Sequence, residues 1–226
     1  MKKYIVILLF LIFTDALYSQ QVKVTNDFGF WSGINIEKKL PNGFKINFEQ
    51  QVRLYSNARE LDDYIVDFGG KYMINKNFRL RINLRYIYDQ KRWKDAENNY
   101  RYYLDLLYKG KLTTKLRLHY RLRYQHEYVN LFTEYHSKKI HYSGIRNKIK
   151  AQLKLNEQNN IYVSGELFRL IETHREPYFN KIRFHIGDEF ETKIGSFNFS
   201  AGYEQEINDS NPLTFFLIKT IYTLKL

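Results

Sequence analysis

Strict alternation between apolar and charged side chains constrains this chain more than any other feature. In FRLRINLRYIY, residues 78–88, every even position is apolar or aromatic, while Arg79, Arg81 and Arg85 occupy odd positions. A β-strand, with its two-residue side-chain period, places these two sets on opposite faces. One face therefore meets an apolar environment, and the other meets an environment that accommodates several arginines.

The same alternation recurs along the rest of the sequence. About eleven segments show it: 28–38, 44–54, 64–72, 78–88, 100–109, 116–125, 145–155, 161–171, 181–191, 197–207 and 214–226. Each is near the ~10 residues expected of a tilted membrane strand, and no helical period follows residue 20. The sequence predicts an all-β fold, an up-and-down antiparallel transmembrane β-barrel of 10–12 strands with a charged lumen.

The connections between these segments alternate in length. Short turns are expected at 41–43, 75–77, 156–160 and 193–196, and longer polar segments at 56–63, 89–98, 130–139 and 172–179. A membrane meander of this kind has tight turns on the periplasmic side and longer loops outside. Because bacterial barrels normally close with an even number of strands, we expect one segment to be missed, split or peripheral, with 21–27 as the place of the error.

The first twenty residues are typical of a secretory signal peptide. Lys2 and Lys3 precede an apolar run at 4–13, and small or polar residues follow at 16–19. This run is too short to span a bilayer as a helix. We expect cleavage near 19–21 and a single barrel domain over 21–226, because no Pro/Gly/Ser-rich linker divides the chain. The alternative is a buried N-terminal helix or strand.

Composition narrows the choice of partners. The chain contains no cysteine, which excludes a disulfide framework and a lipid-anchored N-terminus. Loss of Lys2, Lys3 and Asp15 with the signal peptide lowers the net charge from +12 to +11. Such a charge suits nucleic acid, acidic polymers or anionic lipid surfaces. We discount nucleic acid, because a secreted chain rarely meets it.

The placement of aromatic residues indicates which face meets lipid. Phe78, Tyr86 and Tyr88 flank the aliphatic centre of 78–88, and tyrosines likewise flank the centre of 100–108. Tyrosine favours the boundary between hydrocarbon and headgroups, so aromatic residues at both ends of the strands indicate a barrel in the outer membrane with its apolar face toward lipid. The alternative is a soluble periplasmic barrel that binds an apolar ligand inside.

The charged face is expected to line the lumen. Arginine predominates over 79–123 and lysine over 148–154, and carboxylates are present at Glu166, Glu189 and Glu204. Arginines buried in a narrow lumen need carboxylate partners, because an isolated buried charge is very costly. Two interpretations remain open: a salt-bridged plug that holds the barrel together, and a pore or pocket that attracts anions.

No catalytic or metal-binding motif stands out. A barrel lipid hydrolase or acyltransferase needs a nucleophile–base pair near a rim that faces lipid. The best-placed hydroxyls are Ser143, Ser164 and Ser200, while His119 and His185 fall on the polar face and no histidine lies in a recognisable nucleophile motif. We therefore expect no enzyme, no cofactor and no metal, and a lipid hydrolase is the alternative.

Several stretches carry a resemblance to a known family. YRLRYQ (120–125), RNKIKAQLKL (146–155), YVSGELF (162–168), NKIRFHIG (180–187) and the opening DFGFWSGINIEKKL (27–40) resemble the bacterial family catalogued as domain of unknown function 2490. The resemblance covers essentially the whole chain after the signal peptide. It implies a small Gram-negative outer-membrane β-barrel without an activity to carry over, and a lumen cluster formed by Arg121, Arg123, Arg146, Asn147, Lys148, Glu166 and Arg183.

Together these observations predict an outer-membrane β-barrel that acts in the passage or binding of a small anionic solute, or as a structural envelope protein. The expected partners are outer-membrane lipid and a small anion, without nucleic acid. The full predicted lumen cluster comprises Arg79, Arg81, Arg85, Arg121, Arg123, Arg146, Asn147, Lys148, Glu166, Arg183, Glu189 and Glu204.

Overall fold

The computed structural model describes residues 25–90, 95–130, 140–172 and 175–226, so the predicted signal peptide lies outside the described residues. The strands are β1 (Thr25–Lys39), β2 (Phe44–Tyr55), β3 (Glu60–Met73), β4 (Phe78–Asp89), β5 (Glu97–Lys111), β6 (Leu116–Val129), β7 (Ile140–Lys154), β8 (Asn159–Glu172), β9 (Arg175–Glu191), β10 (Gly195–Glu206) and β11 (Leu213–Lys225). A 3-10 turn, Pro41–Gly43, joins β1 to β2. Within the described ranges, no helix has the length and apolar character needed to cross a membrane.

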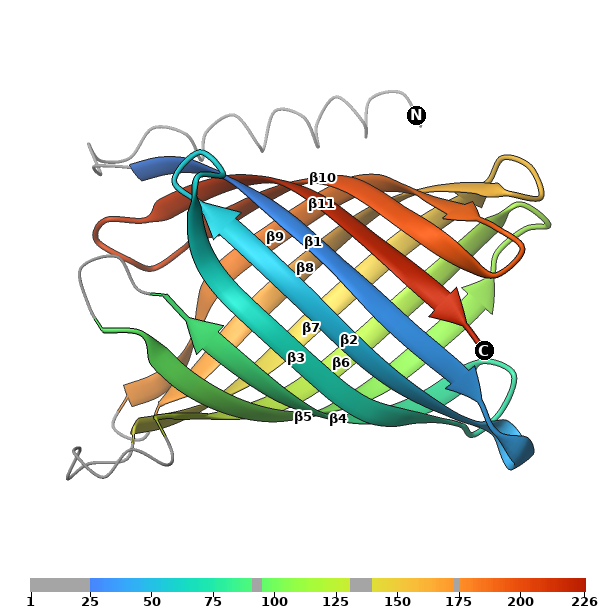
Figure 1. The fold of residues 1–226 in the computed structure, drawn as a ribbon, viewed down its shortest axis with the longest axis horizontal. Coiled ribbons are helices and arrows are strands. Elements are labelled where there is room, and N and C mark those ends of the chain that lie inside the picture. Colours follow the sequence, from blue (N-terminus) through green and yellow to red (C-terminus); the bar gives the residue numbers. More distant parts are fainter. Residues whose placement is uncertain (1–24, 91–94, 131–139, 173–174) are drawn as a thin grey trace, which may run out of the picture.

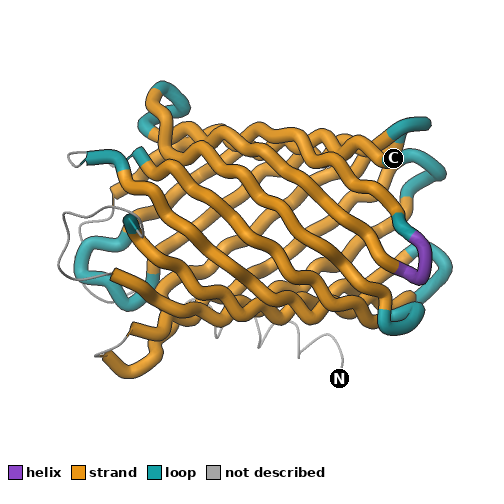
Figure 2. The backbone as a smooth tube through the Cα atoms, turned by 60° about the horizontal axis from the view of Figure 1, so that its bottom comes forward, coloured by secondary structure: helices purple, strands orange, loops and turns teal. Residues whose placement is uncertain are grey.

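The strands form a closed barrel in chain order (Figures 1 and 2). Each strand from β1 to β10 pairs antiparallel with the next one, and β11 pairs with β1 to close the sheet. Each of the eleven predicted segments corresponds to one strand, with ends that differ by a few residues. The prediction of an all-β barrel is confirmed.

The closing pair is parallel. β1 and β11 run in the same direction, from the pairing of Thr25 with Leu213 to that of Glu37 with Lys225. An alternating meander of eleven strands leaves its first and last strands pointing the same way, so closure requires one parallel pair. The expectation of an even strand number is therefore wrong for the described chain. Residues 25–27 begin β1, and residues 21–24 lie outside the described residues.

The connections gather at the two ends of the barrel, which we name the turn end and the loop end (Figure 1). The turn end holds the C-terminus and the turns 40–43, 74–77, 112–115, 155–158 and 192–194. The loop end holds the start of β1, the connections 56–59 and 207–212, and the ends of β4, β5, β6, β7, β8 and β9 that flank the segments outside the described residues. Two predicted long loops are short, because β3 already begins at Glu60 and β9 at Arg175.

Side chains alternate between the two walls of the barrel, as the sequence pattern predicts. On β4, the outward-facing Ile82 and Leu84 are 63% and 65% exposed, whereas Asn83 between them is 1% exposed. Large apolar side chains are exposed on every strand in this way. The apolar face therefore points outward and the charged face encloses the lumen.

Aromatic pairs lie at both ends of the outer wall. Near the turn end, the ring centres of Phe44 and Tyr72 are 4.6 Å apart, and Phe78 packs on Tyr108 at 5.2 Å. Near the loop end, Tyr86 and Tyr100 lie 5.5 Å apart. These pairs join neighbouring strands directly across the sheet. On this side of the barrel, the aromatic residues that the sequence places at strand ends therefore pack together at both ends of the outer wall.

Candidate functional site

The lumen divides into a filled half toward the loop end and an open half toward the turn end. The filled half contains a buried apolar cluster of Trp31, Tyr55, Phe215 and Leu217. The guanidinium carbon of Arg53 lies 4.1 Å from the centre of the Trp31 ring. Charged side chains thus pack directly on the aromatic side chains that fill this part of the barrel.

Arginine–carboxylate pairs complete the filled half. Arg123 donates from Nε and Nη2 to Asp105 over 2.6 and 2.9 Å, and both side chains are buried. Arg85 Nε lies 2.6 Å from Asp67, and the Tyr103 hydroxyl donates to the same Asp67 oxygen at 2.8 Å. Further pairs are Arg53–Asp63, Arg101–Glu127, Arg146–Glu166 and Arg183–Glu204.

Each of these pairs joins adjacent strands, and most of them join directly opposite residues of the ladder. Opposite charges at such positions stabilise the pairing of the two strands, and they also neutralise the buried guanidinium groups. Of the two interpretations of the charged face, the salt-bridged plug describes this half of the lumen.

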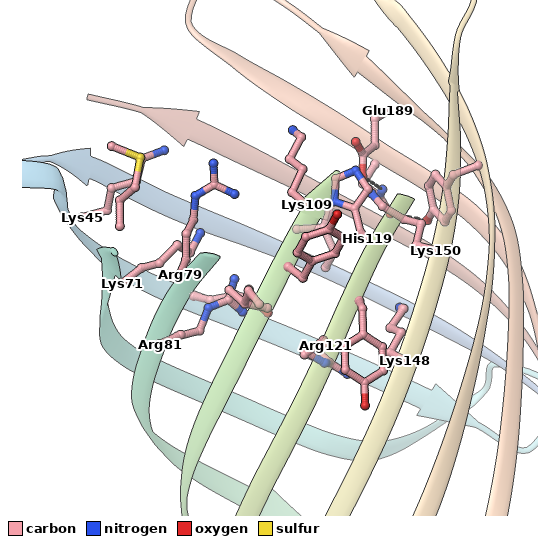
Figure 3. Close-up of a pocket in the computed structure, with 18 of the residues that line it drawn as sticks. Lys45, Lys71, Arg79, Arg81, Lys109, His119, Arg121, Lys148, Lys150 and Glu189 are labelled. Atoms are coloured by element: carbon pink, nitrogen blue, oxygen red, sulfur yellow. Dashed lines mark hydrogen bonds and ion pairs between the residues drawn. The ribbon is translucent and has the colours of Figure 1, made fainter. Parts of the chain in front are cut away.

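The open half forms a cup of about 730 Å³ that begins at the turn end (Figure 3). Two carboxylates line it, Glu49 and Glu189. Ten cationic side chains line it as well: Lys39, Lys45, Lys71, Arg79, Arg81, Lys109, Arg121, Lys148, Lys150 and Lys219. This volume is within the ~300–1,000 Å³ typical of small-molecule sites. The cup is therefore large enough for a ligand and strongly cationic.

Half of the cup cations have a carboxylate within 4.0 Å. Lys150 Nζ lies 2.6 Å from Glu189, and Arg81 lies 3.6 Å from Asp105. Lys45 and Lys71 share Glu37, and Arg121 pairs with Glu166. Among the described residues no such partner is present for the other five, which are Lys39, Arg79, Lys109, Lys148 and Lys219.

The cup wall also contains polar atoms that are buried without a hydrogen-bond partner in the described part of the chain. These atoms are Arg81 Nε, Arg121 Nε and His119 Nε2. Unpaired charges and unsatisfied polar atoms in a partly enclosed space are costly. An anion that enters from the turn end would lower this cost, because opposite charges attract strongly where water is limited.

The structure divides the predicted lumen residues between the two halves. In the filled half it places Arg85, Arg123, Arg146, Glu166, Arg183 and Glu204. On the cup wall it places Arg79, Arg81, Arg121, Lys148 and Glu189. The sequence-based cluster therefore combines two groups of residues with different surroundings.

The placement of Asn147 in the lumen is wrong. On β7, Arg146 and Lys148 face inward, so Asn147 between them points to the outer wall. There the Tyr120 hydroxyl donates to Asn147 Oδ1 at 2.7 Å. The two-residue side-chain period decides this position, since Asn147 shares the phase of the apolar Ile145 and Ile149.

Six of the ten cup cations are absent from the predicted cluster, and they are all the lysines of the cup except Lys148: Lys39, Lys45, Lys71, Lys109, Lys150 and Lys219. Five of them lie on the polar phase of their strands, so the alternation contains the signal that could have found them. Lys219 is the exception, because its phase on β11 is shared with the apolar Phe215, Leu217 and Ile221. What the alternation lacks is their position along the barrel axis. In the described residues, no group of three or more His, Cys, Asp and Glu side chains comes together as a metal site.

Comparisons with known proteins concern the fold and the family. No curated protein matches the chain. Among solved structures, the beta domain of the Bordetella autotransporter BrkA is similar, with 10% sequence identity, a TM-score of 0.46, and coverage of 78% of this chain and 82% of that chain. The family model described as "Protein of unknown function (DUF2490)" matches residues 28–214, from β1 into β11. The chain therefore belongs to the DUF2490 family.

Proposed function

We propose that the protein spans the outer membrane and binds small, multiply charged anions in the cup. The observation that carries the proposal is the set of five cup cations without a carboxylate partner: Lys39, Arg79, Lys109, Lys148 and Lys219. A fixed excess of positive charge inside a narrow space concentrates anions there. An anion with two or more charges satisfies several of these cations at once.

The two walls support a position in a membrane. Outward-facing side chains such as Phe68 and Ile186 are more than half exposed, at 56% and 64%, although they are apolar. Soluble proteins rarely expose continuous apolar surface of this extent. A closed barrel also pairs its backbone groups between strands, which lipid requires. A soluble barrel that holds an apolar ligand would need the opposite arrangement of its walls.

The charges along the axis support a periplasmic position for the cup. The turns of the turn end, with three strand residues on each side, contain 12 Lys and Arg but only 4 Asp and Glu. The same count at the loop end, over the described residues, gives 11 acidic and 3 basic residues. In the sequence, segments 91–94 and 131–139 add five basic residues and one acidic residue. Tight turns face the periplasm in bacterial barrels, so the cup opens toward periplasmic solutes.

The filled half favours binding over passage. Paired buried charges such as Arg123–Asp105 and the Trp31 cluster occupy the lumen between the cup and the loop end. Small barrels often have lumens filled by side chains in this way. We therefore expect the purified protein to give no steady conductance in planar bilayers.

Calorimetric titration of the detergent-solubilised protein with pyrophosphate tests this function. Lys148→Gln/Lys219→Gln is expected to weaken binding by about tenfold or more, because each charge-assisted hydrogen bond contributes about 1.5–3 kcal/mol. Lys193→Gln, an exposed change at the turn end outside the cup lining, serves as the matched control and keeps the affinity. Equal affinities of all three proteins, or no binding at low salt, would refute the assignment.

A further inference from the structure

A second group of polar side chains lies outside the lumen, on the outer wall of β6 and β7 near the loop end. His126 and Ser143 are directly opposite each other in this ladder. The His126 Nδ1 atom lies 2.7 Å from Ser143 Oγ, and the Tyr124 hydroxyl lies 3.2 Å from the same oxygen. A hydroxyl within hydrogen-bond distance of an imidazole nitrogen is the arrangement that a nucleophile and its general base require.

The pair faces away from the lumen. On β6 the inward positions are those of Arg123, Gln125 and Glu127, and His126 lies on the alternate phase with Tyr124, which is 42% exposed. Both His126 and Ser143 are partly exposed. In the membrane position that we propose, a lipid molecule has direct access to the Ser143 hydroxyl.

Aromatic rings fix the depth of the pair. The His126 ring lies 5.4 Å from the rings of Tyr102 and of His141, and 4.6 Å from that of Tyr128. Tyrosine rings concentrate at the boundary between hydrocarbon and headgroups. The ester bonds of glycerolipids join acyl chains to the headgroup region, so they lie at this same depth.

An outward-facing cation lies beside the pair. Arg169 on β8 is opposite Ile145, one outward position along β7 from Ser143, which places it diagonally from Ser143 at about 7–8 Å between backbones. Its side chain is exposed, and the described residues provide no carboxylate within 4.0 Å of it. Its guanidinium carbon lies 5.9 Å from the ring centre of Phe179. A guanidinium in this position suits the phosphate of a lipid headgroup.

We propose that Ser143 and His126 form a nucleophile–base pair that cleaves acyl ester bonds of membrane glycerophospholipids, with Arg169 binding the phosphate. The Ser143 proton passes to His126 Nδ1 while Oγ bonds to the acyl carbonyl carbon. The bond from that carbon to the glycerol oxygen breaks, and the oxygen takes the proton from His126. Water then attacks the acyl-serine, returns a proton through His126 to Ser143, and releases a fatty acid.

This inference requires the outer wall to meet lipid, but it does not require the cup to bind anions. The absence of a sequence motif does not count against it, because the two residues are 17 positions apart and meet only through strand pairing. A purely structural role for the cluster would satisfy the hydrogen bonds of these side chains without any effect on lipid esters. The two roles differ in whether Ser143 reacts with an ester or a serine reagent, so fatty acid release and covalent labelling of Ser143 distinguish them.

The full-length mature protein in mixed micelles of detergent and diacyl phosphatidylethanolamine is tested for fatty acid release by mass spectrometry. Ser143→Ala and His126→Gln are expected to lower release about 100-fold or more. Hexadecanesulfonyl fluoride, a long-chain serine reagent, is expected to modify Ser143 and to be slowed by His126→Gln. Arg169→Gln is expected to raise KM more than it lowers kcat.

The chain offers a matched control inside the lumen, where Ser200 Oγ lies 3.3 Å from His185 Nδ1. Ser200→Ala keeps both release and labelling, because lipid does not reach that pair, and a dialkyl ether lipid gives no product with any variant. The proposal is overturned if the folded protein releases no more fatty acid than Ser143→Ala and the reagent leaves Ser143 unmodified. Heat-modifiable migration on a gel verifies the barrel in each variant.

Discussion

Asp105 is a single carboxylate that holds two guanidinium groups. It accepts both hydrogen bonds from Arg123, and Arg81 from the cup wall lies 3.6 Å away. The Arg123 guanidinium also lies 3.6 Å from the centre of the Tyr103 ring. Asp105 and Arg123 are 0% and 3% exposed, so loss of the carboxylate leaves a buried cation without its partner. This residue joins the filled half to the cup.

We expect Asp105→Asn to lower the free energy of unfolding by about 3–5 kcal/mol, because it leaves Arg123 uncompensated. The double change Asp105→Leu/Arg123→Leu removes both charges and is expected to cost less than the single change. Urea titration in detergent, followed by gel migration of the folded form, measures both. If the double variant is the less stable one, the pair contributes more than mutual neutralisation.

At the scale of the strand, the two-residue period determines which wall each side chain faces, while the neighbouring strand determines its contacts. The alternation alone assigns Arg85 and Arg123 to the lumen. Their carboxylates, Asp67 and Asp105, follow only from the register, because a shift by two residues preserves every facing and changes every partner. For the same reason, the alternation does not predict the contact between Ser143 and His126, which also depends on the register. The sequence therefore predicts which wall of the barrel each side chain faces, and the strand register adds which side chains are in contact.

A lysine scan along β4 tests whether the outer wall meets lipid. Ile82 lies at the middle of the strand and Phe78 at its turn end, and both point outward. Ile82→Lys is expected to cost about 2–4 kcal/mol and Phe78→Lys about 0–1 kcal/mol, because the penalty for a charge depends on depth in the bilayer. Reversible unfolding from lipid vesicles measures the difference. Equal costs at the two positions would argue against a spanning barrel.

Across the residues that the structure describes, the whole barrel is electrically polarised along its axis, with a basic turn end and an acidic loop end. The sequence reveals the net charge of +12 and the alternation of connections, but not this separation. Charges far apart in the chain come to the same end only when the meander is closed. The cup is the interior continuation of the basic end, which explains why lysines from many different strands meet there.

Because the chain lacks cysteine, single cysteines report its orientation in the membrane. Ser210→Cys in the 207–212 loop is expected to react with a membrane-impermeant maleimide on intact cells. Lys76→Cys in the 74–77 turn is expected to react only after the outer membrane is permeabilised. Both positions are exposed, so a difference in labelling reports sidedness and not burial. The reverse pattern would place the cup on the cell surface.

The parallel pairing of β1 with β11 has a consequence for the route of the chain. In an even-stranded meander both extremities of the polypeptide emerge in the same compartment, whereas here Thr25 and Leu226 emerge at opposite ends. In the proposed orientation the start of β1 must cross to the cell surface, while the end of β11 stays on the periplasmic side. A peptide epitope inserted directly before Thr25 would consequently be displayed to antibodies on living bacteria.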